Sequence, residues 1–66
     1  MQGKTLKMKR IINDYTIEQI ANVLGIHRQT YSLKEQGKKE FNASEITSLK
    51  SVLKLSPEEV CDIFLN

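Results

Sequence analysis

The chain has 66 residues, which is enough for one small domain with an economical hydrophobic core. A hydrophobic fraction of 39% and a charged fraction of 27% are typical of a globular domain and exclude a disordered tail. One cysteine and one histidine exclude an intramolecular disulfide and a Cys/His zinc site, and no apolar run is long enough to span a membrane.

The net charge of +2 is unevenly distributed along the chain. Residues 1–39 carry an excess of basic side chains, whereas residues 40–66 carry an excess of acidic ones. This asymmetry is typical of a nucleic-acid binder with a separate structural half, but chance variation on a solvated surface explains it equally well. The basic N-terminus is not followed by the apolar stretch of a signal peptide, which favours a cytoplasmic location.

Five helices and no strands are predicted, so the fold class is all-α. The predicted helices cover, approximately, residues 4–13, 17–24, 28–36, 43–54 and 57–65. Three helix starts have the spacing of a capping box, in Thr16–Gln19, Asn42–Glu45 and Ser56–Glu59. Gly25 and Gly37 are predicted to end the second and third helices.

Apolar residues at helical spacing predict one hydrophobic core. Its expected members are Leu6, Ile11, Ile20, Leu24, Ile26, Tyr31, Ile46, Leu49, Leu53, Val60, Ile63 and Phe64. Cys61 is expected to be a small buried residue in the last helix rather than a reactive thiol. The short connections predict a single domain over residues 1–66.

Residues 16–36 have the pattern of a helix-turn-helix. The cap at Thr16 starts the first helix, and the small Ala21 lets the second helix approach it closely. Gly25 supplies the tight turn, and Ile26 anchors the start of the second helix to the core. Two helices crossing through such a turn present the second one to the major groove of DNA.

The segment Tyr15–Gly37 resembles the helix-turn-helix domain of the Cro/lambda-repressor family, also described as XRE-like. The matching positions are Leu6, Arg10, Thr16, Ala21, Leu24, Gly25, Ile26, Thr30, Ser32, Glu35 and Gly37. The rest of the chain is similar to small Cro-like regulators of phages of Gram-positive bacteria. The resemblance implies a compact five-helix domain that binds a double-stranded operator, usually as a homodimer, on the nucleoid in the bacterial cytoplasm.

The resemblance also implies that the predicted helix 28–36 reads the bases. Arg28 and Gln29 open it, and their side chains suit guanine and adenine respectively. Ser32 lies one turn further along the same face. Leu33 is expected to be partly exposed. Its side chain either turns into the core or faces the major groove and contacts a thymine methyl.

A second set of residues is expected to contact DNA phosphates. It comprises Thr16, Gln19, His27, Thr30, Lys38, Lys39 and Asn42. Ile17 replaces a glutamine that the family uses for a phosphate contact, so Thr16 or Gln19 takes over that role or the contact is missing. His27 has two equally supported roles: its side chain contacts a phosphate or a base, or it is only a partly exposed residue at the start of the helix. Arg10 is expected to pair structurally with Glu35, the alternative being a phosphate clamp.

No enzymatic activity is predicted, because the sequence lacks a glycine-rich phosphate loop and a nucleophile–base pair. No cofactor, metal, membrane or small-molecule substrate is expected either. The alternative to direct DNA binding is an antirepressor or modulator that binds another phage repressor protein. The polar side chains of Arg28, Gln29 and Ser32 favour DNA, because a purely protein-binding helix has no need of them.

Overall fold

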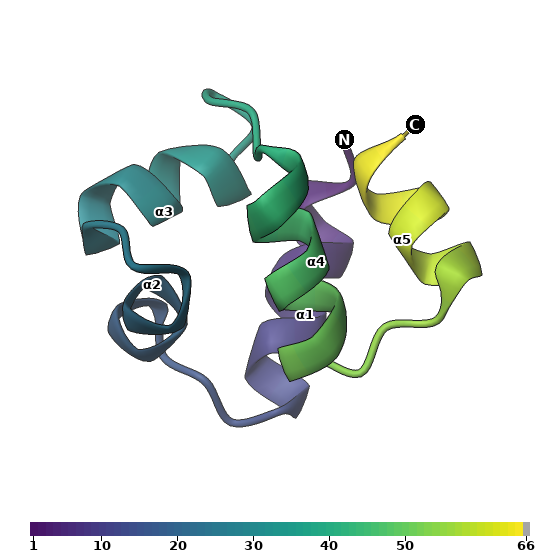
Figure 1. Cartoon of the computed structure of the whole chain (residues 1–66), viewed down its shortest axis with the longest axis horizontal. Coiled ribbons are helices and arrows are strands. Elements are labelled where there is room, and N and C mark those ends of the chain that lie inside the picture. The colour runs from purple at the N-terminus through teal and green to yellow at the C-terminus, as the bar shows by residue number, and fades with distance from the viewer. Residues whose placement is uncertain (66) are drawn as a thin grey trace.

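The computed structural model describes residues 1–65 as five α-helices joined by short loops. They are α1 (Gly3–Ile12), α2 (Ile17–Leu24), α3 (Arg28–Glu35), α4 (Ala43–Val52) and α5 (Pro57–Phe64). Helices α2 and α3 lie at one end of the molecule and α5 at the other, with α1 and α4 between them (Figure 1). The all-α prediction is confirmed, and each helix lies within two residues of its predicted bounds.

The three predicted capping boxes are present. The side chains of Thr16, Asn42 and Ser56 each accept a hydrogen bond from the backbone amide three residues later. The side chain at that later position in turn accepts a hydrogen bond from the amide of the capping residue. Because these bonds satisfy amides that a helix start leaves unpaired, the sequence locates the helix starts accurately.

Four helix ends share one geometry, in which the first or second residue after the helix adopts a left-handed backbone. Gly25 and Gly37 do so with φ values of 71° and 82°. Asp14 and Lys54 do so as well, with φ values of 62° and 55°. In each case the next amide bonds back to a carbonyl five residues earlier, as in the pair Ile26 N–H to Ala21 C=O at 3.0 Å. The prediction that Gly25 and Gly37 end helices is confirmed. Nothing in the sequence predicted a left-handed backbone at Asp14 or Lys54.

The core lies where all five helices meet. Its buried apolar residues are Leu6, Ile20, Ala21, Tyr31, Leu49, Leu53, Leu55 and Ile63. Leu24, Ile26, Val60 and Phe64 are partly buried and pack against it.

Two burial predictions are wrong. Ile11 is 53% exposed, because a spacing of five residues from Leu6 rotates it away from the core. The inner position of that turn belongs to Arg10, which is 6% exposed. Cys61 is exposed because it lies on the outward side of α5, roughly opposite the buried Ile63. Its prediction as a buried small residue therefore fails.

Candidate nucleic-acid interface

The connection between α2 and α3 has the local structure that the sequence predicts. Ile20 is fully buried and Ala21 is 1% exposed, so this side of α2 packs closely against its neighbours. Gly25 ends α2, and a Cβ atom there would meet nothing within 4 Å. Glycine is therefore favoured at this position by its positive φ rather than by lack of space. After two further residues the chain enters α3.

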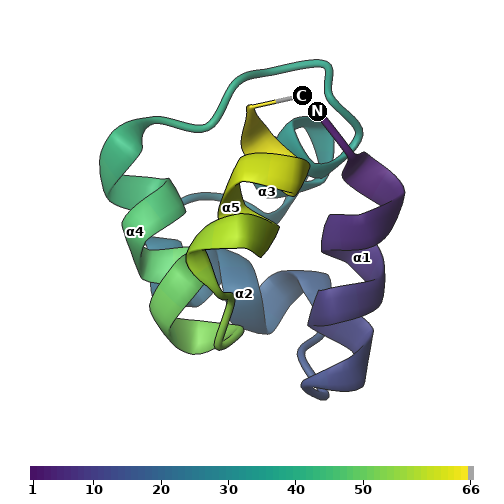
Figure 2. The same ribbon diagram turned by 90° about the vertical axis from the view of Figure 1, so that its right-hand side faces the viewer.

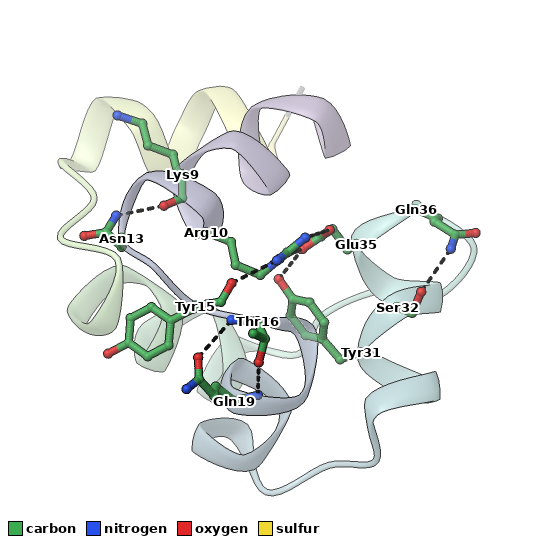
Figure 3. Close-up of polar contacts among 10 residues, drawn as sticks. All are labelled: Lys9, Arg10, Asn13, Tyr15, Thr16, Gln19, Tyr31, Ser32, Glu35 and Gln36. Atoms are coloured by element: carbon green, nitrogen blue, oxygen red, sulfur yellow. Dashed lines mark hydrogen bonds and ion pairs between the residues drawn. The ribbon is translucent and has the colours of Figure 1, made fainter.

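The inner face of α3 is fixed to α1 by a buried ion pair. The Arg10 guanidinium donates to both carboxylate oxygens of Glu35, from Nε to Oε2 at 2.9 Å and from Nη2 to Oε1 at 3.2 Å (Figure 3). The Tyr31 hydroxyl donates to the same carboxylate at 2.6 Å, and Arg10 also donates to the Tyr15 carbonyl at 2.9 Å. The structural pairing of Arg10 with Glu35 is thus confirmed.

The charges in this cluster stabilise one another. The Glu35 carboxylate raises the pKa of Arg10 further above its ordinary value. Burial, followed by the hydrogen bond to Glu35, raises the pKa of the Tyr31 phenol above its ordinary 10.0. Both groups therefore keep the protonation states that the bonds require, and α3 is held at a fixed rotation relative to α1.

A second buried ion pair fixes α3 to α4. The Lys34 ammonium contacts both oxygens of Glu45, at 2.6 and 2.7 Å, and the two side chains are 13% and 7% exposed. Burial pushes the pKa of Glu45 upward, but the bonds from Lys34 and the Asn42 amide outweigh it, so that pKa lies below its ordinary 4.5. The Lys34 ammonium also lies 5.9 Å from the centre of the Phe41 ring. Sequence reasoning missed this pair.

The outer face of α3 carries polar side chains. Gln29, Ser32 and Gln36 follow one another at spacings of three and four residues, which places them along one side of the helix. Gln29 and Gln36 are exposed, and the Gln36 amide donates to the Ser32 hydroxyl at 3.0 Å (Figure 3). Leu33 is half-buried and lies one turn after Gln29, so its partial exposure is confirmed.

A groove of about 600 Å³ lies between the start of α2 and the outer face of α3. Its lining residues are Arg10, Thr16, Ile17, Glu18, Arg28, Gln29 and Ser32. Three of the four predicted base-reading residues therefore meet at one groove. The Arg28 guanidinium lies 4.0 Å from the Glu18 carboxylate, and both side chains are mostly exposed. This is a weak surface contact that leaves Arg28 able to move.

The predicted phosphate residues at the start of α2 are already engaged with each other. The backbone amide of Gln19 donates to the Thr16 side-chain oxygen, at 3.1 Å, and the backbone amide of Thr16 donates to Gln19 Oε1, at 3.0 Å (Figure 3). Because Gln19 uses its oxygen in the capping box, its NH₂ group retains two hydrogen-bond donors. The Thr16 hydroxyl likewise keeps its proton for another acceptor. Capping and a phosphate contact are therefore chemically compatible here.

His27 acts as the cap of α3. Its Nδ1 atom accepts a hydrogen bond from the Gln29 amide at 3.3 Å, which requires the neutral ring with its proton on Nε2. The side chain is exposed, so Nε2–H remains available to an external acceptor. Thr30, the next predicted phosphate residue, is half-buried on a different side of α3 from Gln29.

The remaining predicted phosphate residues lie beyond the other end of α3. Lys38 and Lys39 are exposed, and their backbone amides bond to the Leu33 carbonyl at 2.9 and 3.3 Å. Those bonds hold the basic loop against the end of the helix. The Asn42 side chain caps α4, accepting from the Glu45 amide at 2.8 Å. Apart from Thr30, the predicted phosphate residues thus fall into two groups, one at each end of the outer face of α3.

Two residues at this surface were missed by sequence reasoning. Gln36 extends the polar side of α3 by one turn, and its spacing of four residues from Ser32 is a signal that points to it. Glu18 places a negative charge beside Arg28, and only the folded arrangement of α2 and α3 reveals this proximity.

Among residues 1–65, no group of three or more His, Cys, Asp or Glu side chains could hold a metal ion. None of the helices described here is long and apolar enough to cross a membrane.

Comparison with known proteins identifies a family for this chain. The helix-turn-helix family model matches residues 6–60, which include all of α2, α3 and α4 and most of α1. Searches of curated proteins and of solved structures found no match.

Proposed function

Because the chain belongs to the XRE-type helix-turn-helix family, whose members are DNA-binding transcription regulators, we propose that it binds a specific operator through the outer face of α3. The regulator is of the Cro or repressor type, and α3 enters the major groove. Such an activity needs no cofactor, since recognition depends on shape, charge and hydrogen bonding.

The observation that carries this proposal is the division of α3 into two faces. Its inner face is held by two buried ion pairs, Arg10–Glu35 and Lys34–Glu45. Its outer face presents Gln29, exposed and adjacent to a groove. A rigidly held helix with exposed polar side chains is suited to reading base edges, because little ordering remains to be done on binding.

Arg28 and Gln29 are the proposed principal readers. An arginine can donate to both major-groove acceptors of guanine, and a glutamine can bond adenine through its oxygen and nitrogen. Ser32 and the exposed part of Leu33 continue the reading surface, with Leu33 suited to a thymine methyl. Each good bidentate contact discriminates against a wrong base by about 1–3 kcal/mol.

Hydrogen-bond donors and exposed lysines at the two ends of α3 support this orientation. At one end the free donors of Thr16, Gln19 and His27 face the DNA backbone, and at the other end Lys38 and Lys39 do. Such contacts fix the register of the helix on the duplex without reading its sequence. Two copies of the chain occupy the two half-sites of the proposed operator.

Selection from a random duplex library at about physiological salt tests the proposal. The purified chain should enrich one sequence, and a palindrome would reveal two half-sites at a fixed spacing. Enrichment of a single half-site would support DNA reading by a monomer. Salt-sensitive binding without enrichment would contradict operator recognition and favour the alternative function, a modulator that binds another repressor protein.

A further inference from the structure

We propose that the start of α1 and the end of α3 together bind one phosphate of the DNA backbone. Lys4 and Lys7 of α1 and Gln36 of α3 hold it. This site rests on the proposed function for the identity of its ligand, and it gives α1 a role in DNA binding in addition to its role in the core. The contacted surface thereby extends beyond α2, α3 and the α3–α4 loop.

The start of α1 packs directly against the last turn of α3 (Figures 1 and 2). A Cβ atom on Gly3 would lie 2.5 Å from the Glu35 carbonyl oxygen, which is closer than side chains approach a backbone atom. Glycine is therefore required here by lack of space, in contrast to Gly25. About two turns further along α1, the buried bonds between Arg10 and Glu35 join the same two helices. These contacts fix the first turn of α1 relative to the end of α3.

A pocket of about 360 Å³ lies at this junction. Its lining residues are Gly3, Lys4, Lys7, Glu35 and Gln36. Lys4 and Lys7 are exposed and three residues apart, so they lie on one side of α1. Two ammonium groups and an amide group around one pocket suit an anion with several oxygen atoms, because each group donates hydrogen bonds and the lysines add charge.

The acidic residue of this pocket does not oppose an anion. The Glu35 carboxylate accepts bonds from Arg10 and Tyr31 and is turned towards them inside the molecule (Figure 3). The first turn of α1 contains no acidic residue either. The ion pairs found within residues 1–65 involve other basic side chains, namely Lys9, Arg10, Arg28 and Lys34. The ammonium groups of Lys4 and Lys7 are therefore available to an external anion.

The position of the pocket identifies the anion as a phosphate of bound DNA. Gln36 both lines the pocket and extends the outer face of α3, where its amide donates to the Ser32 hydroxyl at 3.0 Å (Figure 3). The NH₂ group of Gln36 keeps a second donor. A duplex whose major groove receives α3 carries its backbone past the end of this helix. Lys38 and Lys39 follow at the same end, so we expect them to contact neighbouring phosphates.

The salt dependence of duplex binding tests the site in a variant that combines Lys4→Gln with Lys7→Gln. Fluorescence anisotropy should show binding weakened by about tenfold near 0.1 M salt. The slope of log affinity against log salt should decrease by at least about one, because fewer counterions are released. Lys4→Arg with Lys7→Arg keeps both charges and should bind as the natural chain does.

The combination of Lys50→Gln with Lys54→Gln is the matched control. It removes the same charge from two exposed lysines, in and just after the last turn of α4 and away from α3 (Figure 1). Its salt slope should equal that of the natural chain. Circular dichroism checks that every variant is folded.

Uncharged methylphosphonate linkages locate the phosphate on the selected operator. Each linkage is replaced in turn, and the natural chain should lose affinity at every phosphate that it contacts. The variant with Lys4→Gln and Lys7→Gln should be insensitive at one of these positions, because its contact is already lost there. It should remain as sensitive as the natural chain at the others, which include the phosphates contacted by Lys38 and Lys39.

The site is overturned if the variant with Lys4→Gln and Lys7→Gln keeps the natural salt slope, or loses no more affinity than the Lys50 and Lys54 control. It is also overturned if its response to methylphosphonate is unchanged at every position. Enrichment of an operator together with an unchanged slope would contradict this site and leave the proposed function standing. Failure to enrich an operator, with a slope on mixed duplexes that still depends on Lys4 and Lys7, would do the reverse.

Discussion

The two faces of α3 differ in how their side chains are held. On the inner face, Glu35 contacts Arg10 and Tyr31, and Lys34 contacts Glu45, all with little solvent exposure. On the outer face, Gln29 is exposed, and Arg28 makes only a long contact with Glu18. One short helix thus combines a rigid attachment with an adaptable surface. Substitutions on the inner face should lower stability, and those on the outer face should change DNA binding.

The largest effect is expected for Arg10→Met. This change leaves the Glu35 carboxylate buried without its cation and should lower the free energy of unfolding by about 3–5 kcal/mol. A domain of this size has little more stability than that, so the chain should be largely unfolded. Urea denaturation followed by circular dichroism measures the loss. Adding Glu35→Gln removes the uncompensated charge and should restore part of the stability; a fully stable single variant would contradict the account.

A smaller loss is expected for Lys34→Leu. Glu45 would lose its buried cation but keep the hydrogen bond from the Asn42 amide, so the free energy of unfolding should fall by about 1–3 kcal/mol. The same denaturation experiment measures it. Lys38→Leu is the matched control, because Lys38 is exposed and its replacement should change stability by less than about 0.5 kcal/mol. Equal losses for the two variants would argue against a structural role for the buried pair.

The same ion pair predicts a dependence of stability on pH. The pKa of Glu45 is lower in the folded chain than its ordinary 4.5, so the unfolded chain takes up the proton first as the pH falls. The contribution to stability is complete above about pH 4.5 and disappears as the pH falls through the folded pKa. Glu59, whose pKa Lys9 lowers, acts in the same direction. Glu45→Gln should therefore flatten the acid limb of a stability–pH curve; an unchanged limb would contradict the assignment.

On the outer face, Gln29→Ala should leave the free energy of unfolding within about 0.5 kcal/mol of its natural value. Binding to the selected operator should weaken by about 1–3 kcal/mol, through loss of discrimination at one base position. Fluorescence anisotropy with the operator and with single-base variants measures both effects. If the variant bound every duplex more weakly by the same factor, Gln29 would contact a phosphate rather than a base.

The smallest effect is expected for Lys38→Ala. Binding should weaken on every duplex alike, and the slope of log affinity against log salt should decrease by about one. Lys9→Ala provides the comparison, because Lys9 pairs with Glu59 at a distance from α3. A change in sequence preference with Lys38→Ala would contradict its assignment to the phosphate backbone.

Local signals predicted the helices of this fold accurately. The caps at Thr16, Asn42 and Ser56 satisfy backbone amides within a few residues, so their spacing is visible in the sequence. The helix ends at Asp14 and Lys54 could not be predicted from the sequence, because a left-handed backbone is normally predicted from a glycine.

Predictions that depended on tertiary packing were less complete. Apolar character suggested that Ile11 is buried, but the fold buries Arg10 in the same turn by pairing it with Glu35. The resemblance to a family predicted that pair, whereas nothing local indicated the Lys34–Glu45 pair across α3 and α4. At the candidate site, the family resemblance pointed to residues 28–36 as the reading helix, and helical spacing placed Gln29 and Ser32 on one face of it. The contact between Arg28 and Glu18 required the structure.

The most direct test of the central claim is parallel selection from one random duplex library with the natural chain, Arg28→Ala and Gln29→Ala. We expect one enriched operator for the natural chain and, for each variant, relaxed preference at a single position of each half-site. The remaining positions should keep their preference. Identical enriched sequences for all three proteins would contradict the assignment of base reading to the outer face of α3.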